Sequence, residues 1–175
     1  MSHATVVCVT TNPEETRDDL AFCEEDLFDV PGAAFDYARD LDEEEYLERV
    51  NDFLERMERA GAKVDREAQS FTVTDEVVRR YFAASYERLR DLVNRLTFED
   101  FTYGWRNDST ASKDEPPPPT VWDIQNALED EYDDGVCENG TYRSLDSFMR
   151  HAACEVRHHN APVTYCIRGA VDVHH

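Results

Sequence analysis

Lysine is nearly missing from this chain, which has 2 lysines and 16 arginines against 39 aspartates and glutamates. The formal net charge is −21 at pH 7. Proteins bind nucleic acid largely through cationic side chains that release counterions from the phosphates, so a surface this acidic repels the nucleic-acid backbone. Anionic membranes repel it in the same way. We therefore expect neither nucleic acid nor a membrane as the direct partner, and favour a basic protein.

The chain also lacks long apolar runs, since none of its apolar stretches approaches the roughly 20 residues that cross a bilayer. Residues 1–10 have neither the basic region nor the long apolar stretch of a secretory signal. We therefore expect the protein in the cytoplasm.

Disulfide and catalytic signatures are missing as well. The cysteines are odd in number, widely spaced and without a Cys-x-x-Cys pair, which predicts free and mostly buried thiols at Cys8, Cys23, Cys137, Cys154 and Cys166. The 6 glycines are not clustered, and the chain has neither a Gly-x-Ser-x-Gly elbow nor a phosphate-binding glycine loop. These absences favour a protein without catalytic activity.

Apolar sequence is present in an amount that can build a core. Hydrophobic residues make up 41% of the chain and aromatic residues 11%, which is too much for a wholly disordered acidic protein. The β-branched residues 5–10 predict a strand, and the apolar residues 162–173 predict a second strand or a hairpin that turns near Gly169. We expect the two ends of the chain to pair in a small sheet.

Helix signals occupy most of the remaining sequence. Apolar stripes at helical spacing, together with capping residues, predict helices over residues 42–60, 74–96, 121–132 and 145–159. The Asn12-Pro13 pair predicts another short helix to about Cys23. On the polar side of the helix over residues 42–60, acids four residues before an arginine predict three ion pairs: Glu45–Arg49, Asp52–Arg56 and Glu55–Arg59.

These elements predict an α+β fold, in which a small sheet is packed by three to four helices. Residues 1–105 form an acidic strand and helical region, and residues 120–175 form a helix–helix–strand region that packs with it as a single domain. Residues 106–119 lie between them and are polar and rich in proline, a composition typical of a flexible extended loop.

The negative charge is unevenly distributed. Residues 1–50 hold 15 acids against 3 arginines and residues 101–150 hold 11 against 4, whereas residues 51–100 hold 11 against 9. General solvation by acidic side chains would be more uniform, so two acidic patches directed at a partner are predicted. The candidate partner-binding residues are Asp40, Asp42, Glu43, Glu44, Glu48, Asp130, Glu131, Asp133 and Asp134.

One helical segment carries possible metal ligands. In the sequence HAACEVRHH, spacings of three and four residues place His151, Cys154, Glu155 and His158 on one polar flank of the helix. Such a flank can supply ligands for zinc or another divalent metal, although a solvated polar helix face has the same pattern. We therefore expect no cofactor and keep a metal site as the alternative.

The opening MSHATVVCVTTNPEE, followed by LAFCEEDLFDVPGAAFDYARDLDEEE, resembles a loosely defined group of uncharacterised phage and plasmid proteins. Members of that group tend to begin MSH-x-TV and continue through an acidic segment into a Tyr- and Asp-containing stretch. The resemblance covers about the first 45 residues and implies a mobile-element origin, with no activity to carry over. If a phage encodes the chain, the expected compartment is the cytoplasm of the host cell.

Size and charge are similar to those of anti-restriction and anti-CRISPR inhibitors, some of which mimic DNA. The leading hypothesis is therefore a phage or mobile-element protein that inhibits nucleic-acid machinery by occupying a basic surface on it. The alternatives are a metal-binding protein that uses the His/Cys/Glu helix face, and a globular domain whose acidity is an adaptation to high salt.

Overall fold

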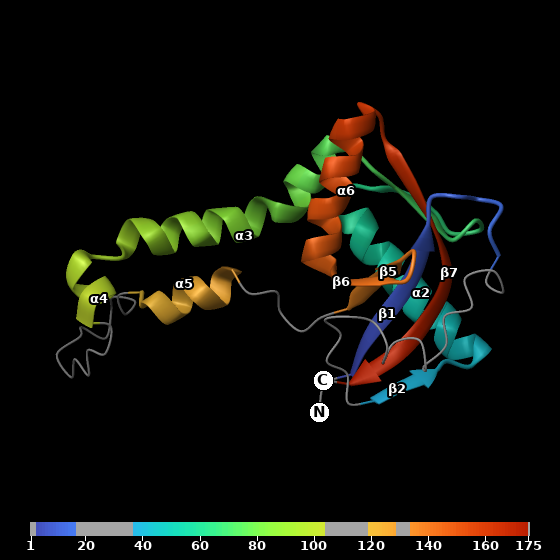
Figure 1. Ribbon diagram of the computed structural model, residues 1–175, viewed down its shortest axis with the longest axis horizontal. Helices are drawn as coiled ribbons and strands as arrows, with labels where there is room; N and C mark the ends of the chain where they lie inside the picture. Colours follow the sequence, from blue (N-terminus) through green and yellow to red (C-terminus); the bar gives the residue numbers. More distant parts are fainter. Residues whose placement is uncertain (1–2, 17–36, 104–118, 129–133, 175) are drawn as a thin grey trace. The chain divides into compact units, whose positions relative to one another are not determined.

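The computed structural model describes residues 3–16, 37–103, 119–128 and 134–174 of the chain (Figure 1). Residues 1–81 and 132–175 form one compact unit, and residues 82–131 form a second. The helix α3 (Asp75–Arg95) begins in the first unit and continues into the second.

A mixed sheet is the centre of the first unit (Figure 1). Its strands are β1 (His3–Thr10), β2 (Tyr37–Asp40), β3 (Lys63–Asp65), β4 (Ser70–Val73), β5 (Gly135–Glu138), β6 (Thr141–Ser144) and β7 (Val163–His174). The order is β3-β4-β7-β1-β5-β6, and β2 pairs with the last part of β7. Only β1 and β5 run parallel to one another in this described sheet, and the other pairs are antiparallel.

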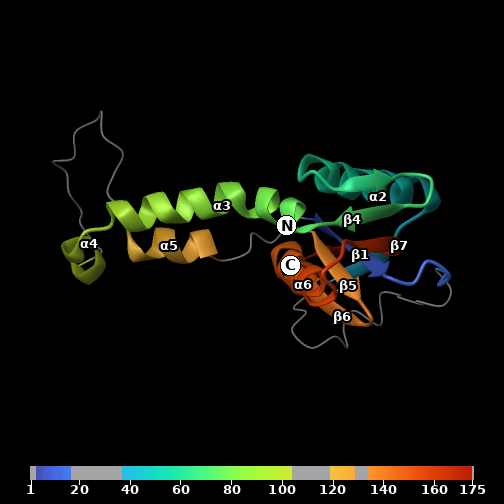
Figure 2. The same cartoon turned by 90° about the horizontal axis from the view of Figure 1, so that it is seen from above.

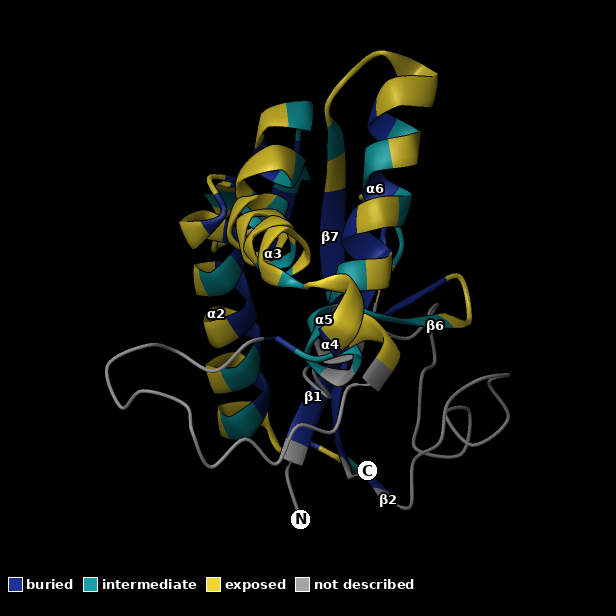
Figure 3. Cartoon of the chain, turned by 90° about the vertical axis from the view of Figure 1, so that its left-hand side faces the viewer, coloured by how far each residue is buried: buried dark blue, intermediate teal, exposed yellow. Residues whose placement is uncertain are grey.

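Two helices, α2 (Glu43–Arg59) and α6 (Leu145–His159), cover one face of this sheet. Both reach the same aromatic side chain, because the ring of Phe71 in β4 lies 5.6 Å from that of Phe53 in α2 and 6.2 Å from that of Phe148 in α6. Tyr165 of β7 stacks on Phe71 at 5.5 Å. Figure 3 shows the buried sides of both helices turned toward the strands and their outer sides exposed. This aromatic cluster is the main core of the unit.

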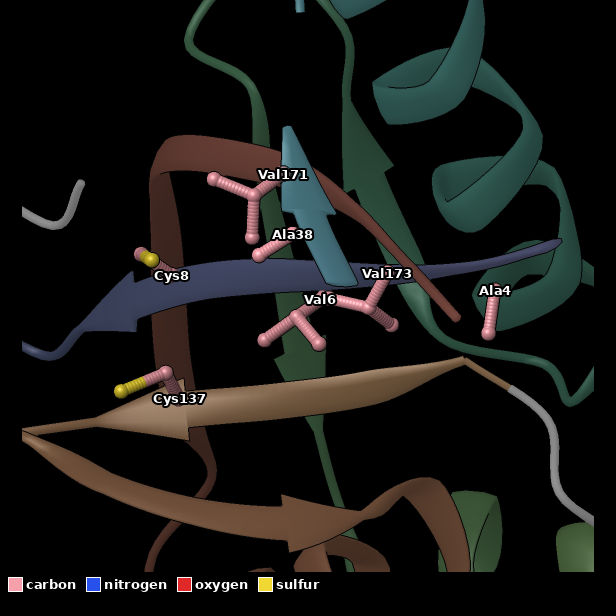
Figure 4. Close-up of a cluster of buried hydrophobic side chains, with 7 residues drawn as sticks. All are labelled: Ala4, Val6, Cys8, Ala38, Cys137, Val171 and Val173. Atoms are coloured by element: carbon pink, nitrogen blue, oxygen red, sulfur yellow. The ribbon is translucent and has the colours of Figure 1, made fainter. Parts of the chain in front are cut away.

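The opposite face of the sheet carries a second apolar cluster of small side chains (Figure 4). Its buried members are Ala4, Val6, Cys8, Ala38, Cys137, Val171 and Val173, and the half-buried Tyr142 packs against them. The two faces follow from strand alternation, in which successive side chains point to opposite sides. Both faces of the central strands are therefore buried, as expected from their nearly continuous apolar sequence.

The second unit contains the remainder of α3, the short helix α4 (Phe98–Tyr103) and α5 (Val121–Leu128), which lies beside α3 (Figures 1 and 2). The two shorter helices begin with the same device. Asp100 and Asp123 each accept hydrogen bonds from the backbone N–H and hydroxyl of the threonine three residues earlier, Thr97 or Thr120. Large apolar residues remain exposed in this unit, at Tyr86, Val93, Phe98 and Phe101.

The α+β fold class predicted from the sequence is confirmed, and the N- and C-terminal strands pair over eight residues of β1. The predicted helices over residues 42–60, 74–96 and 145–159 correspond to α2, α3 and α6. Residues 162–173 form one strand, since β7 continues through Gly169 with a bulge in its pairing to β1 between Cys8 and Val9.

Other sequence expectations have a different outcome. Residues 12–16, predicted to open a helix, contain only a turn at residues 13 and 14, and the remainder of that helix lies outside the described residues. Residues 104–118, most of the predicted Pro-rich loop, also lie outside them. The hairpin formed by β5 and β6 has no counterpart in the sequence-based prediction.

Candidate functional site

Five exposed acids surround the junction at which β2 ends and α2 begins. Asp40 is the last residue of β2, Asp42 is the N-cap of α2, and Glu43, Glu44 and Glu48 follow in its first two turns. None of the five is in an ion pair with a cation of the described residues. These five residues are called the acidic surface below. They are the part of the predicted partner-binding set that the fold brings together.

The acidic surface stands on an ordered frame. The side chain of Asp42 accepts a hydrogen bond from the backbone N–H of Glu45 at 2.9 Å, and that of Glu45 accepts one from the N–H of Asp42 at 3.3 Å. This reciprocal capping box fixes the first turn of α2. Leu41 is buried directly between the two exposed aspartates, and Asp40 is paired with Val171 in the sheet.

Glu45 is the one acid in the first turn of α2 that is neutralised by an arginine within the described chain. Arg39 donates two hydrogen bonds to its carboxylate, at 2.8 and 3.0 Å, and also lies 3.7 Å from the buried carboxylate of Asp172. The bond from Arg39, followed by that from the backbone of Asp42, holds the pKa of Glu45 below its ordinary value. Arg39 thus ties the start of α2 to β7 and leaves the acidic surface negative.

Asp134 belongs to the fold rather than to the acidic surface. Its carboxylate accepts a hydrogen bond from the backbone N–H of Thr5 at 2.8 Å and lies 3.1 Å from the guanidinium of Arg56. Arg56 is three turns along α2 from Glu44, about 18 Å at 1.5 Å per residue. The other predicted acids of this block, Asp130, Glu131 and Asp133, lie outside the described residues.

The ion pairs predicted along α2 are only partly those observed. Arg59 binds Glu55 at 2.6 Å as expected. Glu45, however, is bound by Arg39, and Arg56 extends to Asp134. Sequence spacing within one helix cannot reveal these partners, because they belong to strands and loops that are brought alongside only by the fold.

The predicted metal ligands of α6 do not form a common site in the described structure. His151 places Nε2 3.3 Å from Glu138 of β5, while Glu155 lies 3.3 Å from His159. Cys154 and His158 are exposed, and no group of three His, Cys, Asp or Glu side chains suited to a metal occurs among the described residues. Zinc or another divalent metal stays an alternative, which elemental analysis of tag-free protein tests directly.

A buried polar cluster beneath α6 is absent from the sequence-based prediction. Oε2 of Glu138 lies 3.6 Å from Nη1 of Arg143 and 3.3 Å from Nε2 of His151, and Glu138 is almost fully buried. Among the described residues, no hydrogen-bond partner is present for Oε2 of Glu138, Nη1 of Arg143 or the hydroxyl of Tyr165. Burial, and then the charges of Glu138 and Glu155, raise the pKa of Tyr165. The cluster holds one carboxylate between the guanidinium of Arg143 and the imidazole of His151.

The signal for this cluster is the hairpin that carries it. Asn139 and Gly140, both with positive φ, form the turn between β5 and β6, and Asn-Gly is the strongest short-range hairpin signal in a sequence. Recognising that turn would have placed Glu138 and Arg143 on adjacent strands.

A shallow hollow of about 470 Å³ lies between the start of α3 and the end of α6. Its charged side chains are held together by ion pairs, since Asp75 lies 2.7 Å from Arg79 and 3.7 Å from Arg157. One carboxylate therefore faces two guanidinium groups, which leaves the hollow with a single formal positive charge.

The fold and the acidic surface together define an α+β protein with an anionic, ordered helix start. No family model, no curated protein and no solved structure with which the chain was compared matches it. Within its described residues, no helix is both long enough and apolar enough to cross a membrane.

Proposed function

We propose that this protein is a non-enzymatic inhibitor that occupies a basic nucleic-acid-binding surface on a protein partner, in the manner of anti-restriction or anti-CRISPR proteins. The observation that carries the proposal is the acidic surface, in which five exposed carboxylates within residues 40–48 have no cationic partner among the described residues. A groove of lysine and arginine side chains that normally holds phosphates attracts such a cluster.

Rigidity of the frame supports this role. Binding is weakened when flexible groups must be ordered, so carboxylates already fixed by a capping box and a strand pairing lose less entropy on association. The Arg39–Glu45 pair contributes to this order, because it fastens the first turn of α2 beside β7. Attraction between oppositely charged surfaces also speeds the encounter of the two proteins.

The test is a pull-down from a lysate of the cells that encode the protein, followed by competition with duplex DNA. We expect recovery of a nucleic-acid-processing protein whose DNA binding is blocked. Recovery should be strong at about 0.1 M salt and largely lost at about 0.5 M, where charges are screened over a much shorter distance. Recovery of no such protein, or recovery that is indifferent to salt, would contradict the proposal.

Two charge-matched variants localise the contact. The Asp40→Asn/Glu48→Gln variant removes two charges from the acidic surface, and the Glu67→Gln/Glu99→Gln variant removes two exposed charges elsewhere. We expect the first to weaken binding to the recovered partner by roughly tenfold or more and the second to change it little. Equal weakening by both variants would mean that net charge, and not the acidic surface, is responsible.

A further inference from the structure

Two cysteines lie side by side on the second face of the sheet. Cys8 of β1 and Cys137 of β5 are direct partners in the parallel register of these strands. Both belong to the buried apolar cluster of that face, and both are reduced. Figure 4 shows their sulfur atoms on the same side of the sheet.

The strand pairing already provides the backbone separation of a disulfide. Paired strands lie about 4.8 Å apart, and disulfide-bonded cysteines have Cα atoms about 4.4 to 6.8 Å apart. The other described cysteines lack such a neighbour. Cys166 is paired in the sheet with Thr10 and Ser70, and Cys154 is exposed on α6.

Bond formation requires a rotation of the Cys8 side chain and a small approach of the two strands, because paired strands lie about 4.8 Å apart and bonded cysteines have Cβ atoms about 3.5 to 4.5 Å apart. The sulfur of Cys8 lies over Gly169 of β7. A Cβ atom added to that glycine would be 3.6 Å from the sulfur. A turn about the Cα–Cβ bond to another staggered position directs the sulfur toward the neighbouring strand β5. Such rotations are ordinary for a side chain as small as cysteine, although burial makes them slower than at the surface.

We propose that Cys8 and Cys137 are a redox modification site, at which a small hydroperoxide produces a reversible disulfide. The hydroperoxide oxygen is transferred to one thiol, which becomes a sulfenic acid, while the remainder leaves as water or alcohol. The second thiol attacks the sulfenic sulfur. The S–S bond forms, the S–O bond breaks, and the hydroxyl leaves with the thiol proton as water. The bond then joins the central strand β1 to β5.

Tryptic mapping under non-reducing conditions tests this site, because cleavage after arginine and lysine places each cysteine in a separate peptide. The peptides are residues 1–17, 18–39, 114–143, 151–157 and 158–168. The full-length protein is treated with excess hydrogen peroxide, unfolded, blocked with N-ethylmaleimide and digested. We expect peptide 1–17 linked to peptide 114–143 as the main cross-link, and its loss after dithiothreitol.

Other cross-links overturn the proposal. A dominant bond from peptide 1–17 to peptide 18–39 or 158–168 would assign Cys8 to another partner. Recovery of both thiols in blocked form, while Cys154 is oxidised in the same sample, would show that the pair does not react. The Cys166→Ser variant is the matched control and should keep the cross-link, whereas Cys137→Ser should abolish it.

A stability measurement gives a second readout on the wild-type protein. The bond closes a loop of about 130 residues, which in the chain-entropy model raises the thermal midpoint by roughly 10 °C when the bonded geometry is unstrained. We expect the oxidised protein to unfold at a higher temperature than the reduced protein, and dithiothreitol to reverse the difference. An oxidised Cys8–Cys137 form that unfolds at a lower temperature would contradict a site suited to the bond.

Discussion

The carboxylate of Asp42 has two roles, because it caps α2 and also contributes negative charge to the acidic surface. The substitution Asp42→Ala removes the acceptor for the Glu45 N–H and should lower the free energy of unfolding by about 1 kcal/mol. Chemical denaturation measures this. Asp42→Asn keeps a capping oxygen without the charge and should retain most of the stability, so a loss equal to that of the alanine variant would show that capping is not the cause.

The Arg39–Glu45 pair predicts a dependence on pH. Its hydrogen bonds lower the pKa of Glu45 in the folded state, so the pair stabilises the fold above the unfolded pKa of this carboxyl. That stabilisation is lost as the pH falls through the lowered, folded-state pKa. In Arg39→Gln, the pKa of Glu45 measured by carbon NMR should rise toward its ordinary value. An unchanged titration in this variant would show that Arg39 does not govern Glu45.

The buried Glu138 predicts a large effect from a single substitution. Glu138→Ala leaves Arg143 and His151 without their carboxylate and should lower the free energy of unfolding by roughly 2 to 4 kcal/mol. The double variant Glu138→Leu/Arg143→Met removes both charges and should recover much of the loss. Denaturation of this double variant and of its two single variants, Glu138→Leu and Arg143→Met, forms the comparison, and strict additivity of the two changes would show that the residues are not coupled.

At the scale of elements, the long helices follow from local sequence. Asp42, Thr74 and Ser144 each precede an apolar stripe at helical spacing, and each lies at the start of the helix that it was expected to begin. Capping and amphipathicity are properties of neighbouring residues, so the sequence displays them directly. The short strands β3, β5 and β6 have too few residues to show a clear alternation of apolar and polar side chains. The sequence therefore indicates these strands less clearly than the long helices.

Pairing between elements is a different kind of information. The parallel neighbour of β1 is β5, more than 120 residues away, and β7 accepts both β4 and β2 along one edge. Nothing local in Val136 or Cys137 specifies that partner. For the same reason the sequence grouped Asp134 with the surface acids, whereas the fold places it against Thr5 and Arg56. The exposed acids at the start of α2 were predictable because helix geometry alone positions them.

The turn between β5 and β6 provides a test at this scale. Gly140 has φ of +71° and Asn139 has φ of +50°, a conformation that glycine adopts readily and most residues do not. Gly140→Ala should lower the free energy of unfolding by about 1 kcal/mol through backbone strain alone, since no atom lies within 4 Å of the added Cβ. Asn139→Gly, measured in the same denaturation series, should be neutral within about 0.5 kcal/mol. A neutral alanine variant would mean that the turn adopts another geometry.

For the whole molecule, a net charge of −21 opposes folding by self-repulsion. The described arginines offset this locally, as in the pairs Arg59–Glu55, Arg79–Asp75 and Arg95–Asp91. The acidic surface has no such compensation within the described chain. Two cases can therefore be distinguished by substitution of single acids. In an inhibitor with one directed acidic patch, neutralising an acid relieves repulsion mainly within that patch. In a domain adapted throughout to high salt, neutralising any exposed acid relieves repulsion to a similar extent.

Glu48 is the residue that separates these two cases, because Glu44 and Asp52 lie four residues away on either side of it along α2. Glu48→Gln removes two like-charge contacts and should stabilise the fold by about 0.5 kcal/mol at low salt, whereas Glu67→Gln should have little effect. The protein should be folded at about 0.1 M salt, and the advantage of Glu48→Gln should shrink near 1 M, where the screening length falls to about 3 Å. Thermal unfolding across this salt range makes the measurement. Equal gains from both substitutions, or a chain that folds only in molar salt, would favour general salt adaptation over a directed acidic surface.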